Sequence, residues 1–200
     1  MELKDILNEQ RIYAVLNKVP ILRESEVHLF EELISLYKPS RILEVGTAIG
    51  YSALLLARHG SPEVHIDTIE LDEQRYGMAQ HFIGQSKYKD QISLHLGDAN
   101  EVLPGLEGPY DLVFLDGPKG QYKKQLEMIE PKLAPQAVVL ADNVLFRGYV
   151  RGGKEAPHRY KTIVKRLRDY LQMVEDKDRY NTTIYPLGDG MSVSVWKGNK

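Results

Sequence analysis

Apolar residues along the chain occur either in short continuous runs, as in β-strands, or three and four residues apart, as in helices. The places where one pattern gives way to the other mark the expected boundaries between strands and helices. Short apolar runs that suit β-strands lie at residues 41–45, 64–70, 92–96, 112–115 and 138–141. Between them, apolar residues spaced three and four apart predict helices at residues 52–58, 73–85, 99–103 and 121–128. Strands that alternate with helices form a parallel sheet with both faces covered, so the pattern predicts a doubly wound α/β architecture.

The two ends of the chain depart from this alternation. Residues 1–37 have helical spacing interrupted at Pro20, which predicts two helices before the first strand. After a charged helical stretch at 158–175, two β-rich runs at 182–185 and 191–196 flank the turn Gly188-Asp189-Gly190. Such a pair is typical of a β-hairpin. We therefore expect a Rossmann-like, mostly parallel sheet of seven strands that finishes in an antiparallel hairpin.

The composition fits one domain of this kind and excludes several other classes. With 200 residues, 42% of them hydrophobic, the chain can bury one sizeable core, with an N-terminal helical segment at 1–40 and the sheet at 41–200. The absence of cysteine excludes a disulfide framework and a cysteine–zinc site. We see no signal-peptide pattern and no run of the ~20 apolar residues that cross a membrane, so we expect a soluble cytoplasmic protein without a membrane partner.

The most informative motif is the segment 41–52, in which a strand, a glycine turn and a helix follow one another. Gly46 and Gly50 frame the turn, and glycine lets a backbone approach a ligand closely. Glu44 stands on the strand just before the turn. A carboxylate at that point repels a pyrophosphate but attracts a sulfonium or an α-amino group. The loop therefore favours S-adenosylmethionine over NAD.

Acidic residues also end the second and third expected strands. Glu70 lies twenty residues after Gly50, where an acid accepts hydrogen bonds from ribose hydroxyls. Asp98, in Gly97-Asp98-Ala99, follows the third strand and would flank an adenine. Each acid alone fits a solvated strand end. Their ordered placement at successive strand ends favours a nucleoside cofactor, because ligands of open α/β sheets bind at this edge.

The fourth and fifth expected strands end in oxygen ligands. Asp116 follows one strand, and Asp142 with Asn143 follows the next. The carboxyl ends of neighbouring parallel strands lie together, so two carboxylates and an amide converge. Such a set, without histidine or cysteine, suits Mg²⁺ or Ca²⁺. Helix capping is the alternative for either aspartate alone, but the pair, with Lys119 three residues beyond Asp116, favours a metal site.

A basic segment follows Asn143. The net charge of the chain is −2, so any affinity for nucleic acid must come from a local patch. Within residues 147–168 the only acid is Glu155, and the bases are Arg147, Arg151, Lys154, Arg159, Lys161, Lys165, Arg166 and Arg168. The first part is glycine-rich and contains Tyr149, so Arg147, Tyr149, Arg151 and Lys154 favour RNA contact. The later, helical bases fit a solvated face equally well.

These motifs together resemble the class I S-adenosylmethionine-dependent methyltransferases, and within them the metal-dependent O-methyltransferases of the catechol and caffeoyl-CoA type. The resembling segments are 43–53, 68–70, 110–116 and 140–144. The resemblance implies a cofactor site of Glu44, Gly46, Tyr51, Ser52, Glu70, Gly97, Asp98, Ala99 and Asp116. It also implies that Asp116, Asp142 and Asn143 bind Mg²⁺, and that Asp116 and Lys119 lie at the reacting hydroxyl, where Lys119 is either a base or an electrostatic stabiliser.

Further phrases, at 46–53, 119–122, 142–146 and 186–190, are similar to those of the bacterial tRNA 5-hydroxyuridine methyltransferases. This resemblance implies Mg²⁺-dependent methylation of the 5-hydroxyl of 5-hydroxyuridine at the tRNA wobble position, giving 5-methoxyuridine, with the anticodon loop as partner. A small catechol-like or caffeoyl-type acceptor is an alternative, because it too offers a metal two adjacent oxygens. A non-catalytic adenosine-ligand-binding protein is a second alternative. The apolar N-terminal helices either form a homodimer surface or cover the sheet.

Overall fold

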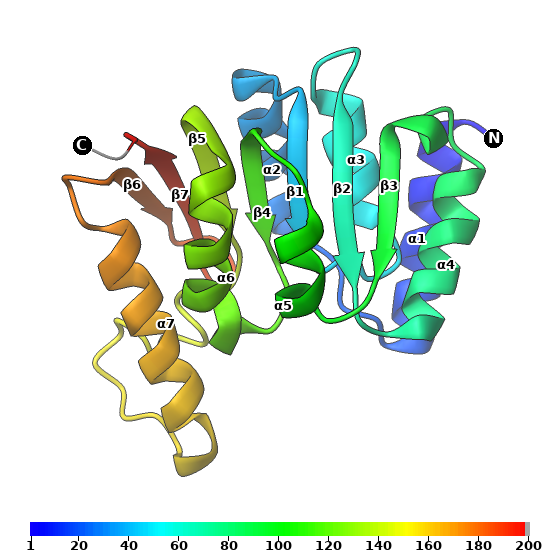
Figure 1. Ribbon diagram of the computed structural model, residues 1–200. Coiled ribbons are helices and arrows are strands. Elements are labelled where there is room, and N and C mark those ends of the chain that lie inside the picture. Colours follow the sequence, from blue (N-terminus) through cyan, green and yellow to red (C-terminus); the bar gives the residue numbers. More distant parts are fainter. Residues whose placement is uncertain (199–200) are drawn as a thin grey trace. The chain divides into compact units, whose positions relative to one another are not determined.

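Helices and strands alternate along the chain as the hydrophobic pattern predicts (Figure 1). The computed structural model describes residues 1–198. Two helices, α1 (Leu3–Asn17) and α2 (Glu24–Tyr37), precede the first strand and are separated around Pro20, as expected. The alternating region then comprises β1 (Arg41–Val45), α3 (Tyr51–His59), β2 (His65–Glu70), α4 (Glu73–Gly84), β3 (Ile92–Leu96), α5 (Ala99–Val102), β4 (Tyr110–Leu115), α6 (Tyr122–Ile129) and β5 (Leu133–Ala141). The last elements are α7 (Lys161–Val174), β6 (Tyr180–Tyr185) and β7 (Met191–Trp196).

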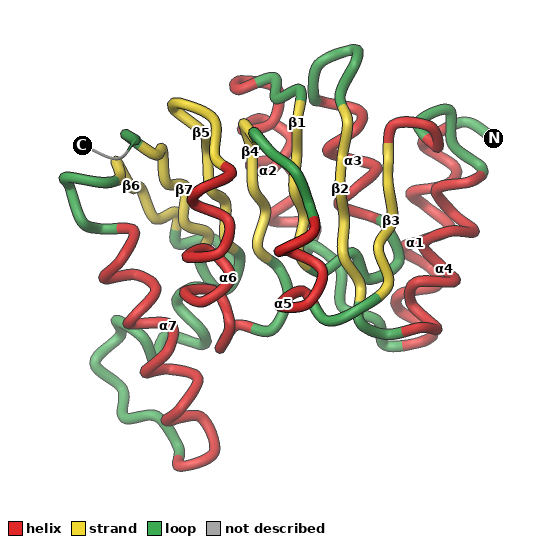
Figure 2. Tube along the Cα trace, in the orientation of Figure 1, coloured by secondary structure: helices red, strands yellow, loops and turns green. Residues whose placement is uncertain are grey.

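The strands have the order β3-β2-β1-β4-β5-β7-β6. By its contacts the chain divides into two compact units, 1–102 and 103–200. In the first unit, β2 is parallel to both β1 and β3. In the second, β4 is parallel to β5, whereas β7 is antiparallel to both β5 and β6. Figure 2 shows these strands in yellow. The expected Rossmann-like, mostly parallel sheet of seven strands with a C-terminal antiparallel hairpin is therefore confirmed.

Several element boundaries differ from the expected ones. β4 begins at Tyr110 rather than 112, β5 at Leu133 rather than 138, and β6 at Tyr180 rather than 182. The charged helix begins with a 3₁₀ turn, His158–Tyr160, before α7. The strand extensions arise because Tyr110 pairs with Leu133 and Tyr180 with Trp196. These partners are distant in sequence, so a local pattern does not reveal them.

Helices cover the strands of each unit through apolar stripes. In the first unit, α2 and α3 lie on the same face of the strands (Figure 1), and α3 also contacts α1. In the second, α6 and α7 lie side by side, with the rings of Tyr122 and Tyr170 packed edge to face at 5.5 Å. Among residues 1–198, no helix combines the length and apolar character that crossing a bilayer requires.

The turn between β6 and β7 is fastened to the segment that follows Asn143. Val144 N donates to Gly190 O at 2.9 Å, and Leu145 N donates to Asp189 O at 2.8 Å. Gly190 has φ +84°, and an added Cβ would lie 2.4 Å from Leu145 Cγ. Any other residue at position 190 would need a left-handed backbone, which is strained for a residue with a Cβ. Its Cβ would also overlap Leu145 Cγ, which cannot move far because it is only two bonds from the Leu145 main chain.

We expect Gly190→Ala to destabilise the protein by about 3 kcal/mol, because it combines overpacking with a left-handed backbone. That loss lowers the melting temperature by roughly 6–12 °C in a chain of this size. Gly77→Ala is the matched control. Gly77 lies within α4, a Cβ there meets nothing within 4 Å, and alanine should be neutral or slightly stabilising. Equal melting temperatures for the two variants would contradict the packing argument.

Candidate functional site

The glycine turn after β1 is held by the strand beside it. Gly46 N and Thr47 N both donate to Ile69 O of β2, at 2.9 and 3.1 Å. Gly46, Ala48 and Gly50 have positive φ values of 104°, 48° and 82°. The backbone thus turns sharply and repeatedly before α3 begins. This geometry explains the two glycines and places the start of α3 directly after the turn.

Glu44 lies at the centre of a buried hydroxyl network. Its side chain is fully buried, and its two oxygens accept hydrogen bonds from Ser52 Oγ at 2.5 Å and Thr68 Oγ1 at 2.6 Å. The Thr68 hydroxyl also bonds that of Thr47, at 2.6 Å. Glu44 therefore ties β1, β2 and the first turn of α3 together. Its expected interaction with a sulfonium or an amino group stays a prediction.

Glu70 closes the glycine turn from the end of β2. Its Oε2 accepts from Ala48 N at 2.7 Å, and its Oε1 accepts from Asp72 N at 2.8 Å. Each carboxylate oxygen has further lone pairs, so these bonds are compatible with ribose hydroxyls as additional donors. The side chain is 7% exposed. Glu70 thus holds the turn in place at the strand end where the sequence predicts a ribose.

The third strand end carries the expected Gly97-Asp98-Ala99 sequence. Asp98 Oδ1 accepts from Asn100 N at 2.7 Å and from Asn100 Nδ2 at 2.8 Å, so the aspartate caps the start of α5. Gly97 has φ +152°, and Ala99 is buried. The capping role and the predicted adenine contact do not exclude each other.

Helix α1 contacts the glycine turn and the start of α3 through two consecutive residues. The fully buried Gln10 donates from Nε2 to Ile49 O at 2.8 Å, and Arg11 Nε donates to Tyr51 Oη at 2.8 Å. Burial raises the pKa of the Tyr51 phenol, and the hydrogen bond from Arg11 lowers it in part. The sequence did not single out Gln10 or Arg11, because their partners lie some forty residues away.

The predicted oxygen ligands of the second unit lie at matching strand ends. Leu115 pairs with Ala141 in the parallel ladder, so Asp116 and Asp142 come directly after two neighbouring strands. Asp142 is buried, and its Oδ1 accepts from Asn143 N at 2.7 Å. Among residues 1–198, no group of three or more His, Cys, Asp or Glu side chains is placed to hold a metal. The two predicted carboxylate ligands would therefore be joined by the Asn143 amide, as the sequence predicts, or by water.

The donor set fits a hard divalent cation. Two carboxylates and one amide oxygen are the ligand types that Mg²⁺ and Ca²⁺ prefer. Tyr122 lies close enough to Asp116 and Asp142 for both carboxylates to affect its pKa. Burial raises the pKa of its phenol well above the usual value, and the charges of Asp116 and Asp142 raise it further. Tyr122 Oη also donates to Asp142 O at 3.0 Å, so this tyrosine, missed by the sequence reasoning, helps to hold the turn.

Lys119 lies next to Asp116, the first of the predicted metal ligands. Its Nζ is 2.7 Å from Asp116 Oδ1, and both side chains are largely buried. The ammonium also lies 5.7 Å from the centre of the Tyr122 ring. A cation is therefore held beside the carboxylate that the sequence assigns both to the metal and to the reacting hydroxyl.

The basic segment forms a loop with an aromatic centre. Rings of Phe146 and Tyr149 lie 5.4 and 6.1 Å from that of Tyr160. Arg147 donates from Nη1 to Tyr160 Oη at 3.1 Å and packs over the ring. Arg159 lies 4.6 Å from the same ring centre. Tyr160, which was not predicted, thus joins the ends of the loop.

Three non-glycine residues of this region have left-handed backbones: Asn143, Phe146 and Arg147, with φ values of 57°, 39° and 56°. Such conformations are costly for residues with a Cβ and cluster at functional sites. Arg151 forms an ion pair with Glu175, whereas Lys154 is exposed. Of the cations predicted to contact RNA, Arg151 is therefore already paired with an acid of the protein, whereas Lys154 faces solvent.

Comparison with known proteins identifies what the chain is similar to. The family described as O-methyltransferase matches residues 2–197. Catechol O-methyltransferase from Mus musculus is 30% identical over 171 residues, which are 78% of this chain and 63% of that enzyme, so the chain spans under two thirds of its length. The crystal structure of a putative caffeoyl-CoA O-methyltransferase from Staphylococcus aureus has a TM-score of 0.86 and 31% identity, covering 95% of this chain and 91% of that one. TomG from Streptomyces achromogenes, an O-methyltransferase of tomaymycin synthesis solved in complex with SAM, has a TM-score of 0.86 and 25% identity, covering 96% and 90%.

Proposed function

The chain belongs to the O-methyltransferase family, and we propose that it transfers a methyl group from S-adenosylmethionine to a hydroxyl oxygen with the help of Mg²⁺. The observation that carries this proposal is the pair of aspartates at matching ends of β4 and β5, with Asn143 attached. In the transfer, the C–S bond of the sulfonium breaks as the O–CH₃ bond forms. The acceptor gives up its hydroxyl proton to solvent water before the transfer, and S-adenosylhomocysteine leaves as the neutral thioether.

The residues of the first unit suit the cofactor. The glycine turn lies next to the start of α3, and Glu70 and Asp98 place carboxylates at the next two strand ends. We assign the methionine part and sulfonium to Glu44, Gly46, Tyr51 and Ser52. The ribose and adenine fall to Glu70, Gly97, Asp98 and Ala99. Solved relatives bound to SAM or its product support the choice of cofactor.

The residues of the second unit suit the acceptor. Asp116, Asp142 and Asn143 would hold the cation, and a bound cation would lower the pKa of the acceptor hydroxyl and help to orient it. Lys119 is paired with Asp116 at 2.7 Å. The ion pair supports an electrostatic role, in which the ammonium stabilises the developing oxyanion, over the role of a general base.

For the acceptor we propose 5-hydroxyuridine at the wobble position of tRNA. Its 5-hydroxyl lies beside the 4-carbonyl, so the nucleobase presents two adjacent oxygens to one cation. The support comes from the loop after Asn143, where cations pack on aromatic rings around Tyr160. Proteins recognise single-stranded RNA by stacking bases on such rings and by neutralising phosphates.

A small catechol-like molecule is the second candidate acceptor. Its two vicinal hydroxyls serve the same ligand set, and the comparisons favour it because the relatives include catechol O-methyltransferases. A small acceptor does not require the basic loop. The two candidates therefore share one reaction centre and differ in what the loop contributes.

One experiment separates these acceptors. The protein is incubated with S-adenosylmethionine, Mg²⁺ and either tRNA that contains 5-hydroxyuridine or catechol, and products are identified by mass spectrometry. We expect 5-methoxyuridine in the digested tRNA. Methylation of catechol alone would reject the tRNA acceptor but keep the chemistry. No methylation of either, together with S-adenosylmethionine binding, would favour a non-catalytic adenosine-ligand-binding protein.

We further propose that a second copy of the chain covers an exposed apolar stripe of α1. Ile12, Val15 and Leu16 lie on one side of the helix and are 53–80% exposed. Light scattering is expected to give twice 22.8 kDa for the wild type and 22.8 kDa for Leu16→Glu. Lys4→Glu, at an exposed polar position of the same helix, is the control. A monomeric wild type would contradict the homodimer.

A further inference from the structure

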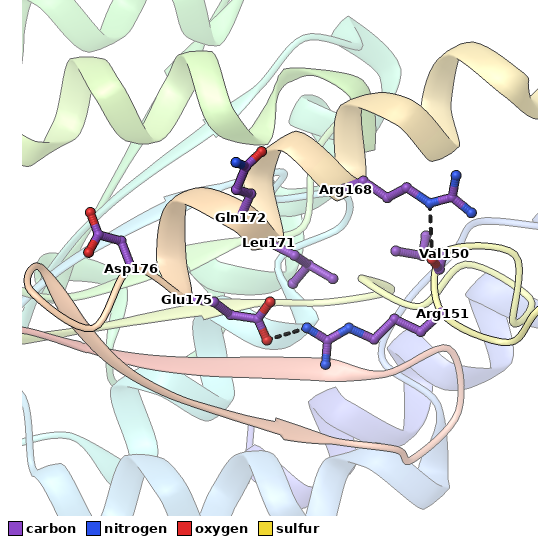
Figure 3. A pocket seen from close by; sticks show the side chains of 7 residues that line it. All are labelled: Val150, Arg151, Arg168, Leu171, Gln172, Glu175 and Asp176. Atoms are coloured by element: carbon purple, nitrogen blue, oxygen red, sulfur yellow. Dashed lines mark hydrogen bonds and ion pairs between the residues drawn. The ribbon is translucent and has the colours of Figure 1, made fainter.

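Helix α7 supports the basic loop through one stripe of side chains. Arg168, Leu171, Gln172 and Glu175 have the spacing of residues on one helix face. With Val150, Arg151 and Asp176 they line a pocket between the helix and the loop (Figure 3). The pocket contains two arginines and two acids, so its charges balance. This composition argues for a structural junction rather than an anion-binding site.

Arg168 donates to two consecutive carbonyl groups of the loop. Its Nε bonds Val150 O at 3.0 Å, and its Nη2 bonds Tyr149 O at 2.9 Å. Figure 3 shows the guanidinium reaching from the helix to Val150. A planar guanidinium presents these donors in a fixed fork, whereas an ammonium acts as a single point charge. Arg168 therefore defines the orientation of two neighbouring peptide planes.

The adjoining residues fasten the same short segment. Val150 is buried, and its N–H donates to Leu145 O at 3.3 Å. Leu171 of α7 is also buried and lines the pocket beside it. Arg151 forms an ion pair with Glu175, one helical turn beyond Leu171 (Figure 3). Three consecutive loop residues, 149, 150 and 151, are thus each tied to α7.

We infer that Arg168 is a positioning residue: it anchors the loop at Tyr149 and Val150 and thereby sets the affinity for the acceptor without touching it. This inference rests on the proposed function, in which the loop contacts the acceptor. Arg168 belongs to the basic stretch that the sequence left open between RNA contact and a solvated face. Its guanidinium is directed to loop carbonyls instead. The Tyr149 ring, next to Tyr160, is the group whose placement depends on it most directly.

The test compares Arg168→Lys, which keeps the charge but not the fork, with the wild type. We expect hydrogen exchange at residues 149–151 to accelerate at least about tenfold, because two charge-assisted hydrogen bonds are lost or weakened. We also expect the KM for the acceptor to rise by about tenfold, with kcat and the Kd for S-adenosylmethionine changed less than about twofold. Lys165→Gln, which removes an exposed charge from the same helix, should leave loop exchange unchanged.

The outcomes are separable. Unchanged exchange at 149–151 in both Arg168→Lys and Arg168→Gln overturns the anchor. Faster exchange with an unchanged KM, for whichever acceptor the wild type methylates, overturns the link to the acceptor. A wild type that methylates neither 5-hydroxyuridine nor catechol overturns the proposed function, while loop exchange still decides whether Arg168 anchors the segment.

Discussion

Replacing Asp142 by alanine is expected to lower kcat/KM for methyl transfer at least about 100-fold, while binding of S-adenosylmethionine stays within about twofold of the wild type. Losing a group that merely orients a metal ligand already costs 10–100-fold, so losing a ligand costs at least as much. Asp142 is buried at the end of β5, next to Asn143, in the unit that does not carry the glycine turn. The variant therefore separates the acceptor chemistry from the cofactor site.

The measurement combines initial rates at several Mg²⁺ concentrations with calorimetric titration of S-adenosylmethionine. Asp142→Asn is the second variant, since it keeps the shape of the side chain but not its charge. Asp90→Asn, at an exposed position, controls for an unspecific loss of charge. Chelation with EDTA should abolish activity of the wild type, and added Mg²⁺ should restore it. Full activity of Asp142→Ala, or of the wild type under exhaustive chelation, would refute the metal assignment.

Neutralising Arg147, Arg151 and Lys154 together, each to glutamine, is expected to reduce kcat/KM on tRNA by more than about 100-fold. The three cations follow the ligand pair directly, and contacts to phosphates dominate the affinity of proteins for RNA. The slope of log K against log salt concentration should also become less steep by up to about 2. Each lost contact to a phosphate of single-stranded RNA contributes about 0.7 to this slope. Methylation of catechol, if present, should be unaffected.

The surroundings of the three cations predict how much each contributes to tRNA methylation. Arg151 is paired with Glu175, so we expect Arg151→Gln alone to have the smallest effect. Arg147 packs over the Tyr160 ring, and Lys154 is exposed. The control is the double variant Lys161→Gln and Lys165→Gln, which removes two charges from α7. Unchanged tRNA methylation by the triple variant would exclude this loop as the RNA contact and leave the small-molecule acceptor.

Local patterns were sufficient to place much of the candidate site at the ends of the strands. The apolar runs before Asp116 and Asp142 predict parallel strands, and the ladder that pairs Leu115 with Ala141 places both aspartates at matching ends. The same reasoning located Glu70 at the end of β2. These features follow from the period of side chains along a strand and from the rule that ligands bind beyond its carboxyl end. Neither depends on the details of packing.

Other features had no local signal. The hydroxyl of Thr68 that bonds Glu44 lies 24 residues away in sequence, and Tyr160 lies 13 residues from Arg147. Tyr122, Gln10 and Arg11 were not predicted at the site, because each acts through a partner brought close by folding. A hydroxyl or an amide has no preferred partner in a sequence, since any donor in the correct place satisfies it.

The sequence by itself determined the order of helices and strands, the glycine turn and the acids at the strand ends, because periodicity and turn chemistry are local properties of the chain. Only the tertiary structure decided which polar groups meet. It directed Glu44 to Ser52 and Thr68, paired Lys119 with Asp116, and turned Arg168 from the basic helix to the loop carbonyls. Hydrogen bonds and ion pairs act over about 3 Å, and such distances between remote residues exist only once the chain is folded.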